Sequence, residues 1–181
     1  MRENNDPCVV MTGKVRLSYV YLDKPQPPMN GEGVAKYSAS IIVPKSDKKT
    51  VKALNAAINA AIEKGISTKF GGKKPGNLLL PLKDGDVERS QDEAYENSYF
   101  FTAKNEKMMK LSDRNAVDCS PDEIYSGCYA RVVVNFYPYN NGSRGIASTL
   151  LGIQKLEDGE RLGGFNVSFD AVDDDDEDIL N

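Results

Sequence analysis

The sequence predicts a mostly β domain of the α+β class with one main helix. Three observations support this: short segments alternate apolar and polar residues, only one long segment has helical spacing, and strands and helices do not alternate along the chain. The last observation disfavours a parallel α/β sheet, which needs a crossover between successive strands. The length of 181 residues fits one domain with elaborations.

Two alternating segments come first and predict two strands. The first covers residues 9–22, and one of its faces carries Val15, Leu17 and Tyr19. Residues 23–33 are predicted to form a loop because prolines and glycines interrupt the pattern. The second strand covers residues 34–44, where the alternation resumes.

The clearest helix is predicted over residues 47–65. Ser46 is the expected N-cap, and Gly65 is the expected stop. The apolar residues at helical spacing predict a face that docks on the sheet; they are Val51, Leu54, Ile58, Ala61 and Ile62.

The second half of the chain predicts three more strands. An irregular insertion at residues 66–98 comes first, and an insertion of this length is expected to be either functional or mobile. Strands are predicted at 98–104, 128–139 and 146–156, the last two joined as a hairpin by a loop rich in Asn and Gly. About five strands with long connections fit a small Greek-key barrel such as the OB-fold.

Composition narrows the classes of function. The chain has no histidine, which removes the commonest general base and every histidine-dependent triad. Its three cysteines are widely spaced and predict free, buried thiols rather than a metal site. There is no apolar run long enough for a membrane span and no secretory signal pattern, so we expect a soluble cytoplasmic protein without cofactor, metal or membrane partner.

The charge is unevenly distributed. Seven of the 27 carboxylates lie in residues 170–181, which contain no Lys or Arg, so residues 1–169 carry a net charge of about +3. We therefore expect a basic domain at 1–169 followed by an acidic, disordered tail at 170–181. The residues of the tail that would contact a partner are Asp173, Asp174, Asp175, Asp176, Glu177, Asp178, Ile179 and Leu180.

The strand at 128–139 has one apolar face and one aromatic, polar face. Such a face suits single-stranded nucleic acid, because bases stack on aromatic rings while basic groups hold phosphates. The candidate DNA-binding residues on this and neighbouring segments are Lys14, Arg16, Lys36, Lys104, Tyr129, Arg131, Tyr137, Tyr139 and Arg144. The alternative is that these side chains only solvate an open sheet face, since tyrosine favours strands in any case.

Two further motifs carry weaker signals. Lys73 and Lys74 lie on a Gly-rich turn that would either close over a bound strand or remain an ordinary solvated loop. The carboxylate clusters at 83–86 and 120–123 are of a kind that holds divalent metals in nucleases, although neither matches an EF-hand loop and both also read as turns.

Four stretches, at residues 12–22, 37–65, 80–86 and above all 125–164, resemble a family of phage-encoded single-stranded-DNA-binding proteins with an OB-fold. The resemblance implies non-sequence-specific binding of single-stranded DNA in phage replication, recombination or repair, without catalytic activity, in the cytoplasm of an infected bacterium.

The tail resembles the acidic, apolar-tipped C-terminus of bacterial single-stranded-DNA-binding proteins, which implies recruitment of replication or recombination enzymes. Charge alone allows a second role, in which the tail competes with DNA for the basic groove. A homodimer is also expected. The alternative function is a DNA mimic that sequesters a host DNA-binding enzyme.

Overall fold

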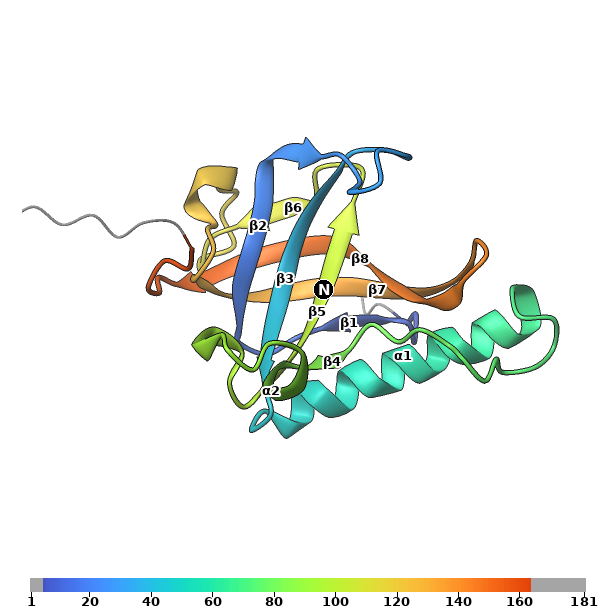
Figure 1. The fold of residues 1–181 in the computed structure, drawn as a ribbon. Helices are drawn as coiled ribbons and strands as arrows, with labels where there is room; N and C mark the ends of the chain where they lie inside the picture. Colours follow the sequence, from blue (N-terminus) through green and yellow to red (C-terminus); the bar gives the residue numbers. More distant parts are fainter. Residues whose placement is uncertain (1–4, 164–181) are drawn as a thin grey trace, which may run out of the picture.

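The computed structural model describes residues 5–163, and the predicted tail at 170–181 lies outside them. Five strands form a closed ring through the pairs β7–β2, β2–β3, β3–β5, β5–β8 and β8–β7. These strands are β2 (Val15–Gln26), β3 (Lys36–Pro44), β5 (Ser98–Asn105), β7 (Tyr129–Asn140) and β8 (Arg144–Glu157). The predicted five-stranded, OB-like barrel is confirmed (Figure 1).

Three short strands extend this ring. β1 (Val9–Met11) pairs with β7, β4 (Lys83–Asp84) pairs with β5, and β6 (Lys110–Ser112) runs parallel to β8. The sequence pattern joined β1 to β2 and gave no strand at β6, because three-residue strands are too short to show a period.

The barrel core is built from alternate residues of the long strands. On β7, the even positions from Ala130 to Pro138 are buried and the odd positions are half-buried, as the alternation predicted. Phe101 of β5 and Phe136 of β7 meet inside the barrel with ring centres 5.6 Å apart. Among residues 5–163, no helix is long and apolar enough to cross a membrane.

Helix α1 (Lys48–Thr68) packs against β7, β1 and β8, below the barrel in Figure 1. Its predicted apolar face is confirmed, since Leu54, Ile58, Ala61 and Ile62 are buried. The N-cap prediction was wrong by one residue: the side chain of Asp47, not that of Ser46, accepts a hydrogen bond from the Thr50 N–H at 3.1 Å.

Gly65 does not end the helix, which continues to Thr68. A Cβ atom at Gly65 would lie 2.3 Å from the ring of Phe70 and 2.8 Å from Cβ of Pro138. Glycine at this position therefore allows close packing of α1 on β7, a requirement that the helical pattern alone does not show.

The first predicted strand also differs from the structure at Tyr19. Val15 and Leu17 are buried as expected, but Tyr19 is 47% exposed and has a φ of +46°. The pairing of β2 with β3 shifts register after Ser18, so a β-bulge moves the alternation by one position. The strand then continues through the predicted loop as far as Gln26, which pairs with Lys36.

The insertion at 66–98 contains ordered elements between its loops. It includes β4, the short helix α2 (Gly85–Glu88) and the 3-10 helix η1 (Glu93–Tyr95), which lie over the lower end of β3 and β5 in Figure 1. Tyr95 is fully buried, its ring centre is 4.9 Å from that of Phe100, and its hydroxyl lies 3.2 Å from Ser40 Oγ. A second 3-10 helix, η2 (Pro121–Glu123), precedes β7.

Candidate nucleic-acid interface

A cleft of about 790 Å³ lies on the outer face of the barrel, over strands β3, β5, β7 and β8. Its floor is formed by residues that alternate with the core, such as Thr102 and Lys104, which alternate with buried Phe101 and Ala103 on β5. Residues 79–81 complete the wall beside the β7–β8 hairpin, where the Leu79 N–H donates to the Arg144 carbonyl at 3.0 Å and the Ile146 N–H donates to the Leu79 carbonyl at 2.9 Å.

Four of the predicted DNA-binding residues come together in this cleft: Lys36, Lys104, Tyr137 and Tyr139. Lys36 and Lys104 come from adjacent strands, because β3 pairs with β5. Arg144 is exposed beside the hairpin tip and is not among the cleft-lining residues, although its carbonyl accepts a hydrogen bond from Leu79, which lines the cleft.

The two tyrosines of the cleft are held by their neighbours on β7. Buried Phe136 and Pro138 flank Tyr137, so the strand alternation turns both tyrosines to the outer face. The Tyr139 ring lies against Gly145, where a Cβ atom would be 2.5 Å from the tyrosine hydroxyl. Burial, together with nearby Tyr139 and Glu106, raises the pKa of Tyr137 above its usual value.

The remaining predicted residues form a separate cluster near the start of β7. Lys14 Nζ and Arg16 Cζ lie 5.5 and 5.4 Å from the ring centre of Tyr129. Tyr129 precedes Tyr137 by eight residues, which corresponds to about 26 Å along a strand. The structure thus divides the predicted groove residues into two groups.

The basic groups of this second cluster already have partners within the fold. Lys14 forms an ion pair with Glu157 at 2.8 Å, and Arg16 donates to the carbonyls of Gly127 and Glu160. Arg131 donates to the side chain of Gln154. These contacts compete with phosphate binding, so a DNA-binding role for this cluster remains a prediction.

Several cleft residues were not among the predicted DNA-binding residues. Leu79 and Leu80 are 53% and 51% exposed, which is unusual for leucine, and both line the cleft. Lys83 and Lys107 add positive charge, and Glu106 adds a single carboxylate. They lie in loops or in the two-residue strand β4, which are too short or too irregular to show a period. Only the clustering of lysines near the turns could have indicated Lys83 and Lys107. Lys73 and Lys74 are exposed and are not among the cleft-lining residues.

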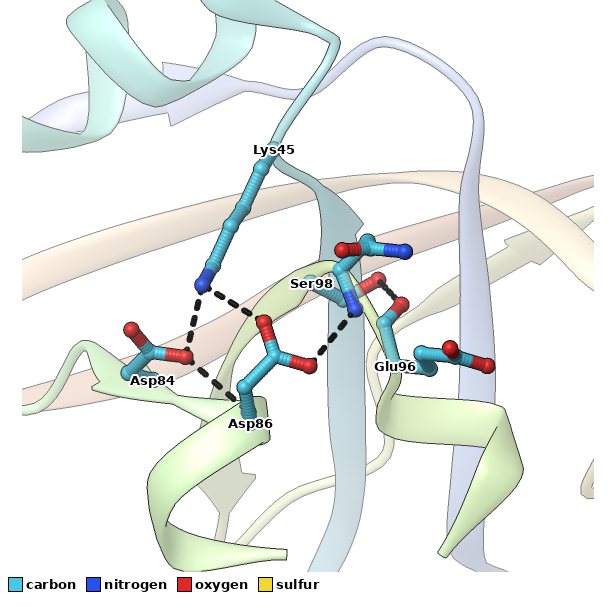
Figure 2. Close-up of polar contacts among 6 residues, drawn as sticks. Lys45, Asp84, Asp86, Glu96 and Ser98 are labelled. Carbon is cyan, nitrogen blue, oxygen red and sulfur yellow. Dashed lines mark hydrogen bonds and ion pairs between the residues drawn. The ribbon is translucent and has the colours of Figure 1, made fainter. Parts of the chain in front are cut away.

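The carboxylate motif at 83–86 forms an ion-pair cluster (Figure 2). Lys45 Nζ lies 2.8 Å from both Asp84 and Asp86, and Asp86 also accepts the Asn97 N–H at 2.9 Å. The hydrogen bonds to Asp84 and Asp86 raise the pKa of Lys45, and those from Lys45 and Asn97 lower the pKa of Asp86. Within residues 5–163, no group of three or more acidic or cysteine side chains is placed to hold a metal ion.

Replacing Asp86 with asparagine should lower the melting temperature at neutral pH. Asparagine keeps an acceptor for Asn97 but loses the charge next to Lys45. Because the folded pKa of Asp86 lies below the unfolded value of 3.8, its contribution is present above that value and disappears as the pH falls through the folded pKa. Thermal unfolding of the wild type and of Asp86→Asn between pH 7 and pH 2 measures the difference in melting temperature. Glu63→Gln on the exposed surface of α1 is the control. A difference in melting temperature that persists at pH 2 would contradict the ion-pair explanation.

A closed five-stranded barrel with an open cleft of lysines and tyrosines on its outer face is the architecture of small barrels that bind single-stranded nucleic acid. The model of the family described as "Enterobacter phage Enc34, ssDNA-binding protein" matches residues 8–180. The chain belongs to this family.

The relatives agree with this assignment. Putative protein p50 of Acyrthosiphon pisum secondary endosymbiont phage 1 is 29% identical over 91% of this chain and 92% of its own length. The single-stranded DNA-binding protein of bacteriophage Enc34, solved in complex with ssDNA, is 27% identical, with a TM-score of 0.77 over 86% of this chain and 90% of that chain. The single-stranded DNA-binding protein gp2.5 of bacteriophage T7 shares the fold, with a TM-score of 0.59 at 15% identity, over 94% of this chain and 93% of that chain.

Proposed function

We propose that this protein binds single-stranded DNA without sequence specificity, and that the cleft on the outer barrel face is the binding site. The observation that carries the proposal is the convergence of two outward tyrosines and several lysines on the face that OB-folds use for oligonucleotides. Membership of a phage ssDNA-binding family supports the same function.

In the proposed mode of binding, bases stack on Tyr137 and Tyr139 while lysines neutralise phosphates. The lysines that line the cleft are Lys36, Lys83, Lys104 and Lys107. Stacking on a ring accepts every base, so binding of this kind is insensitive to sequence. Leu79 and Leu80 would form an apolar wall on which an unpaired base packs and loses its hydration. Arg144, which is exposed beside the hairpin tip, would contact the backbone of a strand that leaves the cleft.

Titration of a labelled oligo(dT) tests the proposal directly. Four neutralised phosphates should give a slope of log affinity against log salt of about −3, or a loss of about 50-fold between 50 and 200 mM salt. A duplex of the same length, which cannot splay its bases onto the tyrosines, serves as the control and should bind more weakly. Equal affinity for both DNAs, or no binding to either, would contradict the proposal.

We place this activity in phage DNA replication, recombination or repair inside the infected bacterium, and we expect the protein to act as a homodimer. Light scattering of the purified protein tests the oligomeric state. The alternative of a DNA mimic predicts an acidic domain surface, whereas residues 1–169 are net basic.

The tail at 170–181, which lies outside the described residues, is proposed to recruit partner enzymes and to compete with DNA for the cleft. Deleting residues 170–181 should therefore tighten binding of oligo(dT), most strongly at low salt, where the attraction between the tail and the basic cleft is least screened. Anisotropy titrations at 20 and 200 mM salt measure the effect. A full-length variant with the six consecutive acidic residues at 173–178 changed to Asn and Gln separates the effect of the tail's charge from that of its length. If the wild type and the deletion variant bind oligo(dT) with equal affinity at both salt concentrations, competition is excluded.

A further inference from the structure

The bulge in β2 turns two tyrosines away from the core. Tyr19 has a φ of +46°, in the left-handed region that a bulky residue rarely adopts. Leu17 and Leu22 on either side stay buried, while Tyr19 and Tyr21 are 47% and 41% exposed. Backbone strain of this kind persists only where the surrounding structure holds it, and it collects at functional sites.

The strand register places Tyr21 in line with the cleft. Tyr21 pairs with Ser38 of β3, and Ser38 pairs with Lys104 of β5, so the three residues form one row across the outer face. Adjacent strands are about 4.8 Å apart, which puts Tyr21 about 10 Å from Lys104. Lys36, which lines the cleft, is two residues from Ser38 on the same strand and therefore lies on the same face.

An arginine from the insertion lies over the other outward ring. Arg89, which follows α2, is exposed, and its Cζ atom is 5.4 Å from the ring centre of Tyr19. The same guanidinium lies 5.7 Å from the ring centres of Tyr95 and Phe100, within cation–π distance of both. None of the ion pairs among residues 5–163 includes Arg89, so its charge is available to a phosphate.

We infer that Tyr19, Tyr21 and Arg89 form a second stacking platform that extends the single-stranded DNA track from the cleft across β3 onto β2. Tyr21 would receive the base that follows those in the cleft, and Arg89 would hold the next phosphate beside Tyr19. The inference rests on the proposed function, and it gives the segment around α2 a role in DNA binding.

A length series of oligo(dT) tests this inference with the full-length protein. Tyr21→Ala should lower affinity for a 12-mer about 5- to 160-fold, as expected for the loss of one stacked base at about 1–3 kcal/mol, and should leave a trimer that fills only the cleft unaffected. Tyr21→Phe, which keeps the ring, is the matched control and should bind like the wild type. Crosslinking to an oligonucleotide that carries 5-iododeoxyuridine should label peptide 17–24 in the wild type.

The outcomes separate the inference from the proposed function. Suppose that Tyr19→Ala and Tyr21→Ala leave affinity unchanged at every length, while alanines at Tyr137 and Tyr139 reduce it. The inference of a second platform is then wrong, whereas the proposed binding site in the cleft is supported. Equal losses for the trimer and the 12-mer would mean that Tyr21 acts through the fold of the cleft, which also overturns the inference. A wild-type protein that binds no oligo(dT) would overturn both.

Discussion

Replacing both Tyr137 and Tyr139 with alanine should lower the affinity for oligo(dT) by at least 30-fold. Each stacked base contributes about 1–3 kcal/mol, so two rings together account for about 2–6 kcal/mol, or roughly 30-fold to more than 10⁴-fold. Fluorescence anisotropy of a labelled oligonucleotide is the suitable measurement, because intrinsic fluorescence would change with the number of tyrosines.

The double variant Tyr137→Phe, Tyr139→Phe provides the matched control. It keeps both rings and removes both hydroxyls, so it should retain most of the affinity if stacking is the main contribution. Both tyrosines are half-buried, and circular dichroism at the temperature of the titration must show that each variant is folded. If the alanine variant is folded and binds like the wild type, the tyrosines have no stacking role.

Replacing Gly65 with alanine should destabilise the protein, although alanine is about 1 kcal/mol more favourable than glycine inside a helix. The new Cβ would lie 2.3 Å from the Phe70 ring and 2.8 Å from Pro138, which forces α1 away from β7. Overpacking of this kind costs about 1–3 kcal/mol. We expect a lower melting temperature, by about 2–4 °C for each kcal/mol of net loss, in a thermal unfolding experiment.

The same substitution should also weaken DNA binding, because Pro138 lies between the two tyrosines of the cleft. Asn59→Ala is the control: it changes an exposed position of α1 to the same residue without a close contact, and it should leave stability equal or slightly higher. A melting temperature for Gly65→Ala at or above that of the wild type would contradict this account of the packing between α1 and β7.

The elements that the sequence predicted well are those with a long, regular period. The alternation in β7 gave the buried and outward faces of the strand correctly, and the spacing of Leu54, Ile58 and Ile62 gave the docked face of α1. The errors of the sequence-based prediction occur where a tertiary contact overrides a local sequence pattern. The helical pattern predicted that the helix ends at Gly65. It could not show the contact with Pro138, because Pro138 lies on a strand more than 70 residues away in the sequence.

The cleft was predictable only in part, for a similar reason. Tyr137 and Tyr139 stand out on a regular strand, whereas Leu79, Lys83 and Lys107 lie in segments without a period. Lys14 and Arg16, like Lys36, are basic residues on the polar face of a predicted strand, so the sequence pattern does not distinguish them. Only the closed barrel places Lys14 and Arg16 beside Tyr129, away from the cleft that contains Lys36.

The sequence by itself determined the strand faces, the single amphipathic helix and the contrast between a basic body and an acidic end, because these depend on residue spacing and charge along the chain. The tertiary structure alone decided which basic residues share a cleft. It also decided which of them instead form an ion pair with Glu157 or donate hydrogen bonds to backbone carbonyls. It also turned Tyr19 outward. Register and bulges depend on the partner strand, and the partner is fixed only when the barrel closes.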